Sequence, residues 1–256
     1  PAVISGTAVQ YLSMPLLGYW MGKAWQLSDD NFIGIVMVGC VPGAMASNVL
    51  TLNARGNASY SVGLTTLATM LSPLVVPLAL GLTLQRWDTE QIDLLWQSAF
   101  TLAWSVVLPV LLGFGLARSS ASIGRVCERL GPATANLMIL WVIAAVIAAN
   151  RDRLMSFQFD VIGALVCVNL LGYVAGYLGG VLLRLDEPMR RALTLEVGMQ
   201  NAGLGATLAL ALFPGRPAVA IAPALFMFGC MLSGTLLAQA WAWNDARSLA
   251  ARGDAT

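Results

Sequence analysis

Apolar residues in this chain fall into eight blocks separated by short polar stretches. Each block is about as long as the ~20 residues that a helix needs to cross the hydrocarbon core of a bilayer. The blocks are residues 2–20, 32–52, 60–82, 94–116, 133–149, 161–183, 192–213 and 218–241. The pattern predicts an all-α polytopic membrane protein. The longest polar stretch, residues 118–132, predicts a short surface helix at 124–130.

Two of the eight blocks carry helix-breaking residues near their midpoints. The second block reads FIGIVMVGCVPGAMASNVLTL, with Pro42 and Gly43 in its centre, and the seventh contains LEVGMQNAGLGATLAL, where glycines flank Gln200 and Asn201. Proline removes a backbone hydrogen bond and glycine weakens helical preference. Kinked but continuous helices are the alternative, since both residue types are frequent in membrane helices. Polar side chains at both breaks favour two discontinuous helices.

The spacing of the two breaks indicates an inverted repeat. They are five blocks apart, so the two segments cross the membrane in opposite directions, as inverted-topology repeats require. The first three blocks then match the last three, which leaves the fourth and fifth without counterparts. We therefore expect two further helices before Pro1 in the whole protein, giving ten helices in two repeats of five, of which eight are present here.

Composition agrees with a membrane protein and gives its orientation. The chain is 58% hydrophobic and only 11% charged, whereas soluble domains carry about 25% charged residues. If the first residue is cytoplasmic, nine of the 14 Lys and Arg residues lie on the cytoplasmic side. The positive-inside rule then predicts that both ends are cytoplasmic. A net charge of +1 predicts no nucleic-acid partner, and the absence of histidine removes the commonest zinc ligand.

Glu196 is the one acidic residue inside an apolar block, and that block contains no Lys or Arg. An ionised carboxylate at bilayer depth costs about 2.5–3.5 kcal/mol on insertion scales. Glu196 lies nine residues beyond Glu187, or roughly 13 Å along a helix. This is too deep for stabilisation by the first turn of the helix dipole. The sequence therefore predicts a mobile cation as its partner.

Neutral oxygen donors accompany Glu196 in the interrupted blocks and beside them. Gln200 follows Glu196 at i+4 on the same helix face, and unwound segments expose backbone carbonyls that coordinate Na⁺. The other donors are Gln10, Ser47, Asn48, Ser61, Thr65 and Thr66. The alternative for each hydroxyl is a bond to a carbonyl four residues back. The alternative for each amide is a hydrogen bond between helices, which is our interpretation of Asn169.

The segments VPGAMASNVLTLNARGNASYSV and EVGMQNAGLGATLA resemble those of the bile acid:sodium symporter family. The resemblance runs over the whole chain and implies a bacterial member with a ten-helix fold. It implies a six-helix core, whose halves are residues 1–84 and 158–256, and a four-helix panel, of which residues 91–150 are one part. The two absent helices would belong to the panel.

The same resemblance implies two sodium sites and a substrate face. The first sodium site would use Ser47, Asn48, Ser61, Thr65 and Glu196. The second would use Gln10, Glu196, Gln200 and the backbone carbonyls of Val197 and Met199. Asn201 would face the substrate, together with Met45, Ala46 and Met231. Met45, Cys230 and Met231 stand where family members often have more polar residues. Sodium coupling is therefore expected, and a bile acid is not assumed as the substrate.

We interpret the chain as a secondary transporter of the bacterial inner membrane. It would couple inward Na⁺ movement to uptake of a small organic anion by alternating access, with no oligomer required. Proton coupling, with Glu196 as the titrating group, is the alternative within transport. A non-transporting sensor or a channel on the same fold is the alternative from another class. An enzyme is disfavoured because the chain has no histidine and no Ser–Lys pair at bilayer depth.

Overall fold

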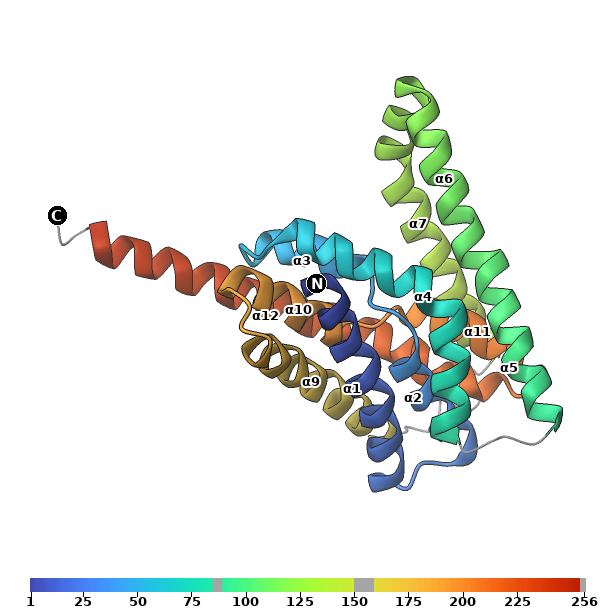
Figure 1. Cartoon of the computed structure of the whole chain (residues 1–256). Helices are drawn as coiled ribbons and strands as arrows, with labels where there is room; N and C mark the ends of the chain where they lie inside the picture. The colour runs from blue at the N-terminus through green and yellow to red at the C-terminus, as the bar shows by residue number, and fades with distance from the viewer. Residues whose placement is uncertain (85–88, 150–158, 254–256) are drawn as a thin grey trace.

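A computed structural model describes residues 1–84, 89–149 and 159–253 of the chain. These residues form helices joined by short connections, and no strand occurs among them (Figure 1). In chain order the helices are α1 (Ala2–Ala24), α2 (Asp29–Cys40), α3 (Ala46–Asn53), α4 (Ala58–Leu84), α5 (Thr89–Leu102), η1 (Ala103–Val107), α6 (Leu108–Ser119), α7 (Ala121–Ala149), α9 (Phe159–Leu182), α10 (Glu187–Gly198), α11 (Ala202–Leu212), η2 (Pro217–Ala220) and α12 (Ile221–Gly253). The all-α prediction is confirmed.

Four helical segments in the described residues have the length and apolar composition needed to cross a bilayer. They are Ala58–Leu84, Trp96–Ser119, Phe159–Leu182 and Pro217–Ser248. They correspond to the third, fourth, sixth and eighth predicted blocks. Helix α1 covers the first block, and the fifth block lies within α7. The chain is therefore a polytopic helical membrane protein, as its hydropathy pattern predicts.

The second and seventh blocks are both discontinuous. Helix α2 ends at Cys40 and α3 begins at Ala46, with an extended backbone at Val41 (φ −73°, ψ 157°). Helix α10 ends at Gly198 and α11 begins after Asn201, whose side-chain oxygen caps α11. The predicted breaks are confirmed. Pro42 and Gly43 interrupt the first helix, and at the second break Asn201 starts a new helix by capping α11. The inverted relation of the two halves stays a prediction.

Two parts of the chain differ in how closely they pack. About half of the apolar window of α4, α9 and α12 is buried inside the protein, compared with 6% for the window at Trp96–Ser119. In Figure 1 the α6–α7 hairpin extends away from the part of the molecule that contains α1, α2 and α10. The residues predicted to coordinate sodium all lie in the closely packed part.

The predicted surface helix at residues 124–130 is wrong as a separate element. These residues form early turns of α7, which continues to Ala149. Helical structure persists through Gly131 and Pro132. One proline removes only one helical hydrogen bond, and membrane helices tolerate this loss.

Candidate functional site

The two helix breaks lie side by side and satisfy each other's backbone groups. The amide of Ala44 donates to the carbonyl of Met199 at 2.8 Å, and the amide of Asn201 donates to the carbonyl of Pro42 at 2.8 Å. The two segments form an isolated antiparallel bridge at this point. Unwound backbone at membrane depth is stable only when such groups are paired within the protein. The bridge therefore fixes the crossing point of α2–α3 and α10–α11.

Glu196 lies at this crossing with no exposed surface. Its Oε2 atom accepts hydrogen bonds from Ser47 Oγ at 2.6 Å and from Thr65 Oγ1 at 2.8 Å. Its Oε1 atom has no hydrogen-bond partner among the residues that the structure describes. No ion pair to Glu196 occurs among those residues either. The carboxylate is thus surrounded by neutral groups, with one oxygen atom available to a cation.

The residues of the first predicted sodium site form one hydrogen-bonded cluster around Glu196. Asn48 Oδ1 accepts from Ser61 Oγ at 2.7 Å and lies 3.3 Å from Thr65 Oγ1, whose hydrogen is donated at the shorter distance to Glu196. Thr51 Oγ1 donates to Ser61 Oγ at 3.2 Å. Thr51 was not predicted, although its position one turn after Ser47 on α3 was a usable signal. The structure brings these oxygens together, and their role as sodium ligands stays a prediction.

The second predicted set also gathers at the break in α10. Gln10 and Gln200 are each 1% exposed, and Gln10 Nε2 donates to Gln200 Oε1 at 3.3 Å. Gln200 Nε2 donates to the carbonyl of Val197 at 2.6 Å. Gln10 Oε1 has no hydrogen-bond partner in the described part of the chain. Unpartnered oxygens of Gln10 and Glu196 are the features that a bound cation would satisfy.

Gly43 has a role that its helix-breaking character alone does not reveal. A Cβ atom at this position would lie 2.1 Å from Glu196 Oε1 and 2.5 Å from its Cδ. Any other residue at position 43 would collide with the carboxylate. Glycine is therefore required here because the Glu196 side chain lies directly against the backbone of the other break.

Of the predicted substrate residues, Met45, Ala46 and Asn201 lie at or beside the two breaks, and Met231 lies on α12. Met45 is 61% exposed and Met231 is 40% exposed, while Ala46 and Asn201 are half-buried. Asn201 Oδ1 accepts a hydrogen bond from the amide of Leu204 at 3.1 Å. Its Nδ2 group donates to no residue in the described ranges, so it can donate to a ligand. The binding role of all four residues stays a prediction.

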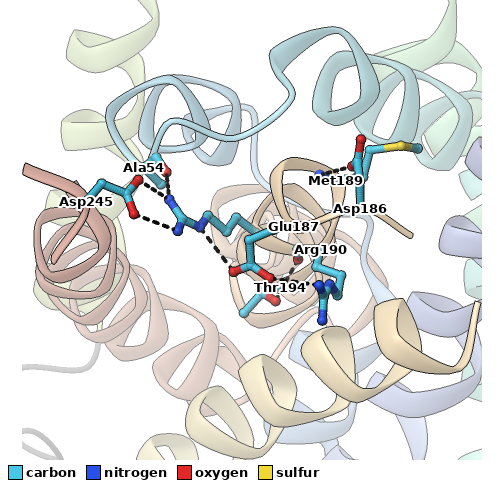
Figure 2. A network of polar contacts seen from close by, with 8 residues as sticks. Ala54, Asp186, Glu187, Met189, Arg190, Thr194 and Asp245 are labelled. Atoms are coloured by element: carbon cyan, nitrogen blue, oxygen red, sulfur yellow. Dashed lines mark hydrogen bonds and ion pairs between the residues drawn. The ribbon is translucent and has the colours of Figure 1, made fainter. Parts of the chain in front are cut away.

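An ion-pair network centred on Arg191 lies five residues before Glu196 on the same helix (Figure 2). The Arg191 guanidinium donates to Asp245 through two bonds, of 2.7 and 3.0 Å, and to the carbonyl of Ala54 at 2.8 Å. Its Nε atom lies 3.2 Å from a carboxylate oxygen of Glu187. These bonds join α10 to Ala54, which directly follows α3, and to Asp245 in the C-terminal part of α12. Bidentate arginine–carboxylate contacts are among the strongest in proteins.

At the other end of the bundle, Arg216 pairs with Asp29 and Asp30 at the start of α2. The hydrogen bonds that Arg216 donates to the carboxylates of Asp29 and, to a smaller extent, Asp30 raise the pKa of Arg216. This cluster joins the connection after α11 to α2, so both broken helices are also tied together outside the crossing.

Residues 1–157, more than half of the chain, match the sequence profile of the Sodium Bile acid symporter family. The chain belongs to this family. It is 34% identical over 240 residues to the uncharacterized sodium-dependent transporter YocS of Bacillus subtilis, covering 93% of this chain and 73% of that protein. It is 30% identical over 239 residues to the probable chloroplastic sodium/metabolite cotransporter BASS1 of Arabidopsis thaliana, covering 93% of this chain and 59% of the relative.

A human protein is among the relatives of lower identity. The ileal sodium/bile acid cotransporter of Homo sapiens is 27% identical over 205 residues, which are 79% of this chain and 58% of that protein. The chain thus spans less than two thirds of the length of the human and Arabidopsis proteins. Its relatives are sodium-dependent transporters by name, which agrees with the family predicted from the two sequence motifs.

Proposed function

We propose that this protein is a secondary transporter that couples inward Na⁺ movement to uptake of a small organic anion. The observation that carries the proposal is Glu196, a fully buried carboxylate between two broken helices, with hydroxyl and amide neighbours and no basic partner in the described residues. A carboxylate at membrane depth needs a compensating charge. Na⁺ supplies that charge and accepts neutral oxygens as its remaining ligands. The sodium dependence in the names of the relatives supports this choice.

Two sodium ions would share the Glu196 carboxylate. One ion would lie among the hydroxyls of α3 and α4, and the other beside the unwound end of α10. The ligands of the first would be Ser47, Asn48, Ser61, Thr65 and Glu196, and those of the second Gln10, Glu196, Gln200 and the carbonyls of Val197 and Met199. With a monovalent anion, each cycle would then carry net positive charge inward, so the membrane potential would assist uptake.

The substrate would bind beside the crossing. The first turns of α3 and α11 begin there, and helix N-termini favour anionic groups. Asn201 would donate its Nδ2 group to the carboxylate of the substrate. Met45, Ala46 and Met231 would contact the apolar body of the anion, so the substrate is expected to carry its polar groups at one end. Alternating exposure of this site would come from movement of the closely packed core against the panel.

The test uses purified protein reconstituted into proteoliposomes. Uptake of radiolabelled taurocholate and lactate, as probes of a large and a small organic anion, is measured with an inward gradient of sodium or choline. A parallel arm replaces the sodium gradient with a proton gradient. We expect sodium to drive uptake of at least one anion. Uptake driven by protons alone would establish proton coupling, and sodium-dependent thermal stabilisation without any flux would establish a sensor.

Asn201→Ala separates substrate binding from sodium binding. The variant removes the proposed donor to the carboxylate, so we expect apparent substrate affinity to fall by about tenfold, as for loss of a hydrogen bond to a charged group. Sodium-dependent stabilisation should stay unchanged, because Asn201 is in neither proposed sodium site. Substrate KM and sodium-dependent melting temperature are the two measurements. Equal loss of both would show that the division of roles is wrong.

A further inference from the structure

Asn169 of α9 binds the broken end of α10. Its Nδ2 group donates to the carbonyl of Gly198, the last residue of α10, at 2.8 Å. Asn169 is 4% exposed and lies within the apolar helix α9. Carbonyls at the end of a helix have lost their intrahelical donors, and in a membrane no water replaces them. The Asn169 amide therefore satisfies a backbone acceptor that the break itself creates.

The face of α9 that carries Asn169 fits closely against this break. Gly172 and Tyr173 follow Asn169 at i+3 and i+4, so all three lie on one side of the helix. A Cβ atom on Gly172 would lie 3.1 Å from Gly198 Cα, and a Cβ atom on Gly198 would lie 2.0 Å from Tyr173 Cδ1. Gly198 is thus in close contact with the backbone of Gly172, the ring of Tyr173 and the amide of Asn169. These contacts leave Gly198 little freedom to move.

A chain of hydrogen bonds in turn orients Asn169. Ser233 Oγ donates to Asn169 Oδ1 at 2.6 Å, and the Tyr173 hydroxyl lies 3.0 Å from Ser233 Oγ. Since Ser233 has a single hydroxyl hydrogen, which it donates to Asn169, it can only accept in the contact with Tyr173, and the Tyr173 hydroxyl has Ser233 Oγ and the carbonyl of Cys230, at 3.3 Å, as its two acceptors. The bond to Oδ1 fixes the amide orientation, so that Nδ2 faces Gly198. We call Tyr173, Ser233 and Asn169 the amide relay. It connects the break in α10 to α12.

Three successive carbonyls at the break have three different donors. The carbonyl of Val197 accepts from Gln200 Nε2 at 2.6 Å, and that of Met199 accepts from the amide of Ala44 at 2.8 Å. Both donors belong to the crossing segments themselves. The carbonyl of Gly198, between them, takes its hydrogen bond from outside the crossing. Because peptide units are planar and share Cα atoms, the orientation of the central carbonyl restricts both neighbours.

We propose that Asn169 is a positioning residue for sodium binding. By holding the Gly198 carbonyl towards α9, it restricts the orientation of the neighbouring carbonyls of Val197 and Met199, which are the proposed backbone ligands of the second sodium site. The inference rests on the proposed function, because it assumes sodium at that site. Asn169 does not touch the ion and acts through the backbone of α10. Partners outside the first ligand shell commonly change metal affinity by about 10–100-fold.

The test is a sodium titration of thermal stability, with choline chloride maintaining ionic strength. Asn169→Ala removes the whole contact, and Asn169→Asp keeps the acceptor for Ser233 but has no NH group for Gly198. We expect both variants to weaken apparent sodium affinity by about 10–100-fold. Ser233→Ala and Tyr173→Phe keep the Asn169 amide but remove hydrogen bonds of the chain that orients it, so each should weaken sodium binding by less. The ratio of sodium to lithium affinity should also change, because carbonyl placement sets the preferred ion size.

Ser72→Ala is the matched control. Ser72 is fully buried in α4, and its hydroxyl donates to the carbonyl of Thr69 in the same helix, at 2.7 Å. This variant should lower the melting temperature in choline without changing sodium affinity or the sodium-to-lithium ratio. An Asn169→Ala protein with unaltered sodium affinity and selectivity would overturn the proposal.

Two further outcomes remain interpretable. If the Asn169 variants do not fold, Ser233→Ala and Tyr173→Phe decide the matter, since unchanged sodium affinity in both would refute the amide relay. If the unmodified protein shows no stabilisation by sodium, the proposed function fails together with this inference. The unmodified protein is therefore titrated first, which distinguishes failure of the sodium site from failure of the role assigned to Asn169.

Discussion

Helix α10 carries two buried charged residues, five positions apart, whose surroundings are opposite. Arg191 contacts two carboxylates and a helix-end carbonyl, so its charge is compensated within the protein. Glu196 contacts two hydroxyls, and one of its carboxylate oxygens has no partner among the described residues. Both side chains are largely or fully removed from solvent. Burial alone therefore does not distinguish a structural charge from a functional one.

The difference lies in what completes each site. A buried ion pair with its hydrogen bonds satisfied is a fixed part of the fold, and removing one partner leaves a costly unpaired group. A buried carboxylate among neutral oxygens is complete only when a cation joins it, so its stability depends on ion concentration. The structure thus predicts that Arg191 stabilises the protein equally with and without sodium. Glu196 is expected to contribute to stability only when sodium is bound.

Glu196→Gln should give the largest effect on the sodium response. The substitution keeps the shape of the side chain and removes its charge, so sodium-dependent stabilisation should disappear. An ion at 100 times its dissociation constant stabilises a protein by about 2.7 kcal/mol, and this entire increment should be lost. Melting temperatures in sodium and choline measure it. Glu187→Gln, which removes an acid from the Arg191 network, is the control and should retain the response.

Gly43→Ala should weaken sodium binding nearly as much without altering any charge. The added methyl group would lie within 2.1 Å of Glu196 Oε1, so the carboxylate or the break must move. We expect sodium affinity to fall by about 100-fold, at the upper end of outer-shell effects. Gly113→Ala is the control, because a Cβ atom there meets nothing within 4 Å. A normal sodium titration for Gly43→Ala would contradict the close approach of the two breaks.

Arg191→Met should change stability and leave the sodium response intact. Loss of the guanidinium leaves the carbonyl of Ala54 and the carboxylate of Asp245 without this donor. Ala54 is fully buried, whereas Asp245 is partly exposed to solvent. An unsatisfied buried carbonyl costs about 1–3 kcal/mol, so the free energy of unfolding should fall by about this amount in sodium and in choline alike. Denaturation in both salts gives the comparison. A decrease confined to the sodium condition would place Arg191 in the ion site after all.

Thr51→Val should cause the smallest change in free energy of the four substitutions. It removes the hydroxyl that donates to Ser61 and leaves the proposed ligands of the first sodium site in place. A single neutral hydrogen bond contributes about 0.5–1.5 kcal/mol, so sodium affinity should fall by about twofold to tenfold. Thr83→Val serves as control, since the Thr83 hydroxyl bonds within its own helix. Loss comparable to that of Glu196→Gln would make Thr51 a direct ligand.

Much of the site could be predicted from sequence because its elements are local. The apolar blocks, the Pro42–Gly43 break and the lone acid at position 196 are visible in short stretches of residues. The proposed ligands were named through resemblance to a family, and the structure brings them together. Thr51 was missed although it lies one turn from Ser47, because a single threonine in an apolar helix most often bonds to its own backbone.

Other features follow only from how the helices pack. Ser47 and Glu196 are 149 positions apart, and Arg191 and Asp245 are 54 apart. The sequence predicts that Asn169 forms a hydrogen bond between helices. It does not indicate that the partner is a backbone carbonyl of a broken helix. The clash that excludes a side chain at Gly43 likewise requires two segments in contact.

The sequence by itself determined that the chain is helical, that it lies in a membrane, where two helices break and which buried acid lacks a basic neighbour in its own block. These properties depend on hydropathy and backbone preference over a few turns of helix. The tertiary structure decided which oxygens surround Glu196, what compensates Arg191 and which carbonyl Asn169 holds. Such contacts depend on the packing of helices distant in sequence, for which local propensity carries no information.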